Sequence, residues 1–504
     1  MRPRDHATPH LTALFFFLLG ILTRLPFRSQ ILNHWDSVNF ALALQHFDIT
    51  LHQPHPPGTF MLYLGLGKLL SFIIPEANAA LVWLSTLLSG LGVMAMYLLA
   101  ERLFGQRVGL LSGALSLTSP LVWYHGEVAL SYILEYAWVP LVVYAIYRME
   151  SRTPGWMLAA SLLLGLSGGV RPNTPVFLFP LWAWAVWRNR YSWKQFFLLG
   201  VLPGAFGALL WFVPMVILTG GLDKYIAVMQ WWQAQHTAES STLAGILEQS
   251  VRLAVYLFYA LTAGVLALLW GAWKNIHSLP DILRRDWRAQ VLALWIAPGL
   301  FYLTVIHIRQ PGHTFTILPG VMLLTALATA DSEQWSALNR LPSIGHRLTS
   351  PACALASILL LANIAFFRFA PPYLFGIQRM LFNTPSANAI RQYDAYVMPR
   401  LTAIREHFGP TSTAVLANGR NFRLPAYYLP NFQALDLSAR FDVGVVDTIL
   451  QPPIHTLVFF DADIIPPLEE DLPPKTLSLP DGSTLTYIQW PPERSVDVSP
   501  QGIR

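Results

Sequence analysis

Long apolar stretches recur along the first 370 residues, and they constrain the fold more than any other feature of this sequence. Eleven of them have about the length of a membrane-crossing helix, roughly 17–25 residues, or are slightly shorter and bounded by charge. A backbone inside hydrocarbon must satisfy its own hydrogen bonds, so each stretch is predicted to be a helix. They fall near residues 11–31, 79–99, 108–122, 130–147, 156–170, 174–187, 195–219, 250–272, 290–306, 313–330 and 350–370.

The composition agrees with a membrane protein. Of the 504 residues, 54% are hydrophobic and 12% are charged, against about 25% charged in soluble domains. This excludes a disordered chain, a collagen-like fibre and an ordinary cytosolic enzyme. A single cysteine, Cys353, excludes a disulfide framework and a cysteine-based zinc site.

The charges are unevenly divided between the apolar part and the tail. Residues 371–504 hold 10 of the 33 Lys and Arg residues and 13 of the 28 Asp and Glu residues. The apolar part therefore carries a net charge of +8, within a total of +5. Basic residues between spans favour the cytoplasmic side of a membrane. We therefore expect them to set the topology, and we expect no nucleic-acid partner.

A twelfth apolar stretch, 57–74, decides the orientation. It contains three glycines and Lys68 and begins at a Pro-Pro pair. If it lies along the interface, the connections alternate between basic and nearly uncharged, as the positive-inside rule requires. This predicts eleven spans in an inner (cytoplasmic) membrane, a cytoplasmic N-terminus and an extracytoplasmic C-terminal domain. The predicted inner residues are Arg2, Arg4, Arg102, Arg107, Arg148, Arg152, Arg188, Arg190, Lys194, Lys274, Arg284, Arg285, Arg288, Arg340 and Arg347.

The tail differs from the rest of the chain. Residues 371–504 hold 17 of the 38 prolines and no apolar stretch long enough to span. A helical pattern at Asn388–His407 is followed by strand-like runs, and Pro480-Asp481-Gly482 predicts a hairpin. The strand-like runs are Thr413–Ala417, His455–Phe460 and Thr484–Trp490. We expect two domains: a transmembrane module, 1–370, and a small soluble α/β domain, 371–504.

Unusual polar residues gather in the predicted outer connections. The first connection, 32–58, contains Asp36 and the histidines 34, 46, 52 and 55, with a short amphipathic helix near 37–47. The second, 123–132, contains His125 and Glu127. Arg171 lies in the third, and later connections contain Trp231-Trp232 and the segment Arg309-Gln310-Pro-Gly-His313.

Each of these residues also has a structural interpretation. Asp36 could cap a helix, Glu127 could be a solvated loop acid, and Arg171 could be a topology anchor that extends to the interface. Arg309 and His313 flank a Pro-Gly turn that could simply be solvated. The histidine spacing matches no zinc site, so ordinary loop histidines are favoured there. Trp231 and Trp232 are favoured as interfacial anchors.

One reaction suits an acid beside cations at a membrane surface. Transfer of a sugar from a polyprenyl-phosphate donor releases a phosphate, which leaves as a stable anion without a general acid. One carboxylate can then act as base on the acceptor, while Arg or His stabilises the phosphate charge. The sequence contains no Walker loop and no Gly-rich dinucleotide loop.

The order of several motifs resembles a known superfamily. These are Asp36-Ser37 after the first helix, His55-Pro-Pro-Gly58, Arg102-Leu-Phe-Gly-Gln-Arg107 and the Trp123–Tyr132 connection, followed by Arg171-Pro172 and Gln310-Pro-Gly-His313. Together they resemble the GT-C membrane glycosyltransferases, in particular the family 39-type group of protein O-mannosyltransferases and aminoarabinose transferases. The resemblance covers about residues 10–330, and it implies a polytopic helical GT-C fold with interfacial helices.

The resemblance also implies roles for the residues. Asp36 matches the catalytic acid of the first outer loop in an inverting transferase that uses a lipid-phosphate sugar. Many relatives have a second acid beside the first, whereas here Ser37, Val38 and Asn39 follow, so Glu127 is the candidate for a second acid or a metal ligand. The candidate substrate-binding residues are His55, His125, Arg171, Arg309, Gln310 and His313. Metal use varies within the superfamily, so a divalent metal is compatible with the resemblance but is not assigned.

Two other classes of function stay open from the sequence. One is a transporter or flippase of a lipid-linked or polar solute, and the other is a non-catalytic subunit that binds glycolipid. The expected partners are a polyprenyl-phosphate sugar donor, the lipid bilayer and an acceptor that is a glycan, a lipid or a protein.

Overall fold

The computed structural model describes residues 7–236, 242–330, 351–374, 384–417, 421, 423–437, 448–461 and 465–504. Four of the basic residues predicted for the inner side, Arg2, Arg4, Arg340 and Arg347, lie outside the described residues. The chain forms two compact units. We call Met1–Arg28, Pro57–Ile73 and Ala80–Ala389 the helical unit, and Ser29–Pro56, Ile74–Ala79 and Ile390–Arg504 the loop-and-sheet unit.

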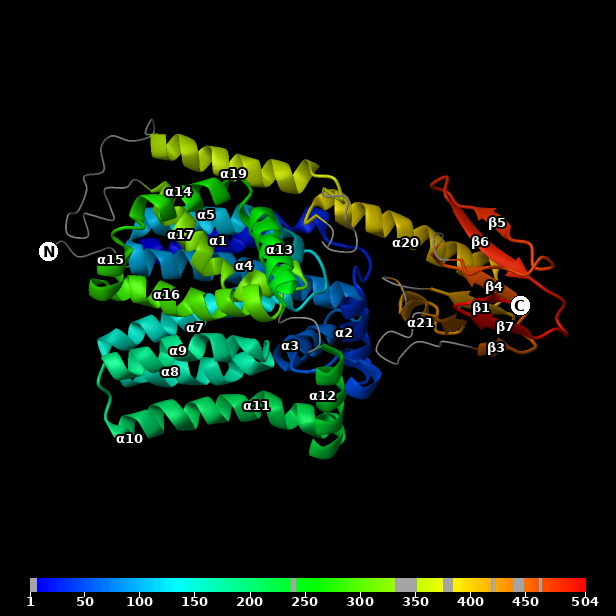
Figure 1. The fold of residues 1–504 in the computed structure, drawn as a ribbon, viewed down its shortest axis with the longest axis horizontal. Helices are drawn as coiled ribbons and strands as arrows, with labels where there is room; N and C mark the ends of the chain where they lie inside the picture. The colour runs from blue at the N-terminus through cyan, green and yellow to red at the C-terminus, as the bar shows by residue number, and fades with distance from the viewer. Residues whose placement is uncertain are drawn as a thin grey trace. The chain divides into compact units, whose positions relative to one another are not determined.

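The helical unit is built from helices that follow the predicted apolar stretches, many of them running side by side in Figure 1. Its α-helices are α1 (Ala7–Leu22), α3 (Met61–Ser71), α4 (Ala77–Phe104, whose first residues belong to the other unit), α5 (Gln106–Thr118), α6 (Pro120–His125), α7 (Tyr132–Arg148), α8 (Pro154–Leu166), α9 (Asn173–Arg188), α10 (Trp193–Gln195), α11 (Leu202–Leu218), α12 (Leu222–His236), α13 (Leu243–Leu261), α14 (Gly264–Asn275), α15 (Leu279–Arg285), α16 (Trp287–Phe301), α17 (Leu318–Thr329) and α19 (Pro351–Phe369).

Local sequence explains where several of these helices begin and end. α8 begins at Pro154, a residue suited to the first helical position because it lacks only an N–H that would be unpaired there. α4, α7 and α9 carry Arg102, Arg148 and Arg188 in their last turns, where a cation opposes the negative end of the helix dipole. These basic residues therefore lie at helix ends, where the flanks of a span meet the membrane surface.

Four helical segments of the described chain are long and apolar enough to cross a membrane by themselves: Pro9–Phe27, Ala77–Phe104, Trp193–Leu218 and Trp287–Ile306. The bent pair Leu243–Leu261 and Gly264–Asn275 would be a fifth if it is one span, and the number of spans stays a prediction. α3 has 11 residues and is about 16 Å long at 1.5 Å per residue, against about 30 Å of hydrocarbon. It is too short to cross alone, which agrees with the interfacial position expected for 57–74.

One predicted segment differs in the structure. The stretch 250–272 is not one straight helix, because α13 and α14 meet at an angle of 112°. The break lies at Thr262, whose φ is 45° and whose hydroxyl donates to Asn363 Oδ1 at 2.6 Å. Trp231 and Trp232 lie near the end of α12, which runs across the direction of α11 in Figure 1.

The loop-and-sheet unit joins the first outer connection to the C-terminal part of the chain. Its helices are α2 (Trp35–Gln45), α20 (Ala387–His407, whose first residues belong to the helical unit) and α21 (Leu424–Tyr428). Its strands are β1 (Thr413–Leu416), β2 (Gln433–Leu435), β3 (Thr448–Leu450), β4 (Thr456–Phe459), β5 (Lys475–Ser478), β6 (Thr484–Gln489), β7 (Val496–Ser499) and β8 (Gly502–Ile503). The predicted boundary at residue 370 stays a prediction.

Two sheets share one apolar core. The five-stranded sheet has the order β2-β1-β4-β6-β5, with β1 parallel to β2 and β4, and the three-stranded sheet has the order β3-β7-β8. Leu416, Phe459 and Ile488 from the first sheet pack with Val496 and Val498 from the second. The predicted hairpin joins β5 to β6, with Gly482 at a φ of 80° that favours glycine.

Candidate functional site

The first candidate group, which we call the Asp36 cluster, consists of His34, Asp36 and His55. Asp36 lies in the first turn of α2, where the positive end of the helix dipole favours a carboxylate. His34 caps this helix, because its Nδ1 accepts the backbone N–H of Asp36 at 3.1 Å. The interpretation of Asp36 as the cap is therefore wrong: its neighbour caps the helix, and its own carboxylate is left for another role.

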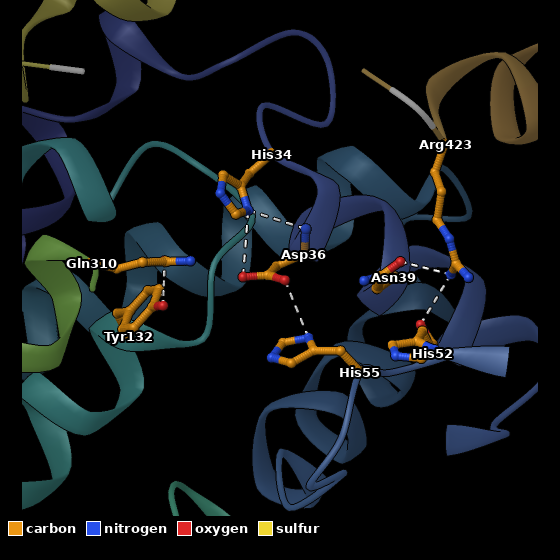
Figure 2. A network of polar contacts seen from close by, with 8 residues as sticks. All are labelled: His34, Asp36, Asn39, His52, His55, Tyr132, Gln310 and Arg423. Atoms are coloured by element: carbon orange, nitrogen blue, oxygen red, sulfur yellow. Dashed lines mark hydrogen bonds and ion pairs between the residues drawn. The ribbon is translucent and has the colours of Figure 1, made fainter. Parts of the chain in front are cut away.

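Both imidazole rings approach the Asp36 carboxylate (Figure 2). His55 Nδ1 lies 3.2 Å from Asp36 Oδ1, and His34 Nδ1 lies 3.4 Å from Oδ2. The residue Asp36 is 5% exposed. Because His34 Nδ1 accepts the Asp36 N–H, His55 is the ring that can donate to the carboxylate. This contact and burial restrict the orientation of the carboxylate, which is what a group that takes a proton from a substrate needs.

The other two histidines of this loop do different things. His46 is exposed at the end of α2. His52 is buried, and burial together with the charge of Arg423 lowers its pKa to about 3, so its ring is neutral near pH 7. Among the described residues, no group of three or more His, Cys, Asp or Glu side chains is arranged to hold a metal ion.

The second candidate group lies in the helical unit around Tyr132, at the start of α7. We call His125, Tyr132, Arg171, Gln310 and His313 the Tyr132 cluster. The Arg171 guanidinium lies 4.0 Å from the centre of the Tyr132 ring, and the Tyr132 hydroxyl donates to Gln310 Oε1 (Figure 2 shows the latter pair). The rings of His125 and His313 lie 5.4 and 5.9 Å from that of Tyr132. Four predicted substrate-binding residues from three connections thus surround one tyrosine.

A buried acid that the sequence analysis missed orients Arg171. Glu135 lies one helical turn after Tyr132, and its Oε2 is 3.5 Å from Arg171 Nε. Its other oxygen accepts the hydroxyls of Thr174 and Thr316, each at 2.6 Å. Arg171 is therefore more than a topology anchor, since an ion pair and a ring contact both hold its guanidinium. Glu135 lies inside an apolar stretch, where an acid without a partner is costly. Its position in the sequence could therefore have predicted a buried, partnered acid.

The close packing around Tyr132 depends on the Pro-Gly turn. A Cβ atom added at Gly312 would lie 2.2 Å from the Tyr132 ring, which explains why this turn contains glycine. Arg309 itself is exposed, its carbonyl accepts the Tyr256 hydroxyl at 2.9 Å, and its N–H donates to His313 Nδ1 at 3.3 Å. His313 therefore helps to fix the turn.

Glu127 is fully buried, so the interpretation of a solvated loop acid is wrong. It interacts electrostatically with Arg24, which is also fully buried near the end of α1. Arg24 Nε donates to Ser89 Oγ at 3.1 Å, and its guanidinium lies 5.0 Å from the centre of the Trp123 ring. Two buried acids of the described helical unit thus lie beside an arginine: Glu127 beside Arg24 and Glu135 beside Arg171.

Comparisons with known proteins are consistent with these observations. Residues 55–218 match the family described as dolichyl-phosphate-mannose-protein mannosyltransferase. ArnT from Cupriavidus metallidurans in the apo state is similar in structure, with a TM-score of 0.55 and 12% identity over 95% of this chain and 97% of that one. ArnT bound to undecaprenyl phosphate gives 0.55 and 12% over 96% and 98%. An Archaeoglobus fulgidus oligosaccharyltransferase gives 0.46 and 13% over 88% and 67%. A comparison with curated protein sequences returned no match.

These findings confirm the resemblance to GT-C membrane glycosyltransferases and the predicted fold class. The match to ArnT extends over almost the whole of both chains, including the C-terminal sheet domain. The fold and the apolar helices are those of a membrane protein.

Proposed function

We propose that this chain, which has the GT-C fold, transfers a sugar from a polyprenyl-phosphate donor to a hydroxyl or amine acceptor at the outer face of an inner membrane. Two findings support this donor class. The description of the matched family names dolichyl-phosphate-mannose, and one similar ArnT structure contains undecaprenyl phosphate. The proposal applies this lipid-phosphate chemistry to the present chain.

The geometry of the Asp36 cluster carries the proposal. Its carboxylate is buried and lies at the N-terminus of a helix that His34 caps, and His55 Nδ1 lies 3.2 Å from it. We assign Asp36 as the base and His55 as the residue that orients it. The acceptor oxygen or nitrogen attacks the anomeric carbon, the bond from that carbon to the phosphate oxygen breaks, and the acceptor proton passes to the Asp36 carboxylate. Attack opposite the leaving group inverts the anomeric carbon.

The departing phosphate needs cations, and we assign that role to the Tyr132 cluster. Arginine pairs two phosphate oxygens through its planar fork, and Glu135 and Tyr132 already hold Arg171 in place. His125, His313 and Gln310 add ring and amide groups to the same cluster. We keep Arg309 as an exposed second cation for the phosphate and Glu127 as the second acid, buried beside Arg24.

The decisive experiment replaces Asp36 with Asn, which keeps the size of the side chain and removes the base. Purified protein in detergent is incubated with a panel of polyprenyl-phosphate sugars and acceptors. Loss of a general base lowers kcat by about 10²–10⁴-fold, so we expect a loss in that range. Donor binding should persist, because the assigned phosphate-binding groups are unchanged.

Asp48→Asn is the matched control. Asp48 belongs to the same loop, and its side chain accepts the backbone N–H of Thr50 at 2.8 Å, a capping role that Asn also performs. Its activity should stay near that of the wild type. Transfer at a near-wild-type rate by Asp36→Asn would exclude the mechanism. Donor binding without turnover by the wild type would indicate a non-catalytic subunit, and solute uptake without a glycosylated product would indicate a transporter.

A further inference from the structure

The C-terminal part of the chain contacts the loop that carries Asp36 through one buried arginine. Arg423 lies just before α21 and is 6% exposed. Its Nη1 donates to Asn39 Oδ1 at 2.7 Å and to the His52 carbonyl at 3.0 Å, and its Nη2 donates to the Leu51 carbonyl at 2.6 Å. Figure 2 shows the guanidinium directed at Asn39 and His52.

The three acceptors lie at two different places in the loop. Asn39 is three residues after Asp36 on α2, so it belongs to the helix that carries the proposed base. The carbonyls of Leu51 and His52 end a short 3₁₀ turn, Ile49–Leu51, three residues before His55. His52 there has a φ of 55°, a conformation that non-glycine residues seldom adopt. One side chain thus connects the helix of Asp36 to the turn from which His55 reaches it.

Two further contacts join the start of this loop to the C-terminal part. Asp394 on α20 accepts the Ser29 hydroxyl at 2.9 Å and the Gln30 N–H at 3.0 Å. The Tyr428 hydroxyl, on α21, accepts the Leu32 N–H at 3.0 Å. The loop is therefore bound at its beginning, in its middle and near its end to residues almost four hundred positions later in the chain.

We propose that Arg423 is a positioning residue for the Asp36–His55 pair. The inference rests on the proposed function and deepens it, because it gives Arg423, in the C-terminal part of the chain, a role in placing the proposed base. Arg423 does not touch the reacting atoms; it holds the α2 helix and the Leu51–His52 turn at a fixed separation. A lysine cannot replace it fully, because one ammonium lacks the planar fork that reaches acceptors on two sides.

The test compares Arg423→Ala and Arg423→Lys with the wild type in transfer kinetics. A misplacement of about 1 Å at a reacting group costs about 100-fold in rate. We expect kcat to fall by about 10- to 100-fold for Arg423→Ala and by less for Arg423→Lys. KM for the polyprenyl-phosphate donor should stay near the wild-type value, because a positioning residue does not contribute to donor binding. Arg494→Ala is the matched control: this arginine belongs to the same unit but pairs with Glu469 and Asp471 at the surface. It should leave kcat unchanged.

Hydrogen exchange of peptides covering residues 35–55 provides a readout that needs no activity. We expect faster amide exchange there in Arg423→Ala and wild-type exchange in Arg494→Ala. If Arg423→Ala does not fold, Asn39→Ala removes one acceptor and should give a smaller change in the same direction. Unchanged exchange in these peptides, or a rise in KM with unchanged kcat, would overturn the positioning role.

A wild type that binds donor but transfers no sugar would instead contradict the proposed function, and the exchange data would still decide whether Arg423 orders the loop.

Discussion

At the residue scale, Asp394 makes the stability of the fold depend on pH. This residue accepts hydrogen bonds from Ser29 and Gln30, at the start of the loop that carries Asp36. Burial raises its pKa to about 6, although the Gln30 N–H and the Ser29 hydroxyl partly oppose this shift. The folded protein therefore keeps a proton that the unfolded chain releases near pH 4. The contribution of protonated Asp394 to the free energy of unfolding is complete below about pH 4 and is lost as pH rises through about 6.

Asp394→Asn cannot ionise, so we expect its Tm relative to the wild type to increase as pH rises from 4 to 7. A shift from 3.8 to about 6 corresponds to at most about 3 kcal/mol, at 1.36 kcal/mol per pKa unit. Thermal unfolding in detergent at several pH values measures this difference. Asp481→Asn is the control: this acid is exposed and its pKa is lowered by Ser483, so its titration lies below the tested range. A pH-independent difference between Asp394→Asn and the wild type would contradict the raised pKa.

The sequence predicted most members of the two clusters but not what holds them. Asp36, His55, Arg171, Gln310 and His313 stood out because a polar side chain beside a span needs a reason. The partners that orient them, Tyr132, Glu135 and Arg423, come from other elements, and their contacts depend on how helices pack. The roles of the predicted site residues stay proposals.

At the element scale, α8 and α11 pack closely because of their glycines. A Cβ atom at Gly165 would lie 2.0 Å from the Gly204 carbonyl oxygen. Gly165→Ala therefore must push the two helices apart, and overpacking of this kind costs about 1–3 kcal/mol. We expect a lower Tm in detergent for this variant.

Gly155→Ala is the matched control in the same helix. A Cβ atom there meets nothing within 4 Å, and Ala is a better helix former than Gly by roughly 1 kcal/mol. Its Tm should be equal to or above that of the wild type. Equal Tm values for Gly165→Ala and the wild type would show that α8 and α11 can move apart without loss of stability, which would contradict the prediction.

The positions of most helices were predictable because an apolar stretch in a membrane has few alternatives to a helix. The bend between α13 and α14 was not, because hydropathy is the same on both sides of Thr262 and the break depends on a positive φ and a bond to Asn363 on α19. The helix near residues 37–47 and the β5–β6 hairpin were predicted, since capping and turn residues act locally.

At the scale of the whole molecule, we expect the loop-and-sheet unit to lie outside the cell membrane and the Arg148–Arg152 connection to lie inside. Reporter cysteines test this in a background where Cys353, the single cysteine of the sequence, is replaced by Ser. Glu493→Cys should react with an impermeant maleimide in intact cells, whereas Ser151→Cys should react only after permeabilisation. Both positions are exposed on the protein, so the reverse labelling pattern would contradict the proposed orientation.

The sequence by itself predicted a polytopic helical membrane protein with a small C-terminal α/β domain and a resemblance to GT-C glycosyltransferases. Hydropathy, helix ends and turns depend on residues close together in the chain. They can therefore be predicted from a single sequence. Only the tertiary structure decided that the first outer loop folds with residues 390–504, and that Glu135 and Tyr132 hold Arg171. These contacts join residues far apart in the chain, and they form only when packing brings buried polar groups together, which no local pattern records.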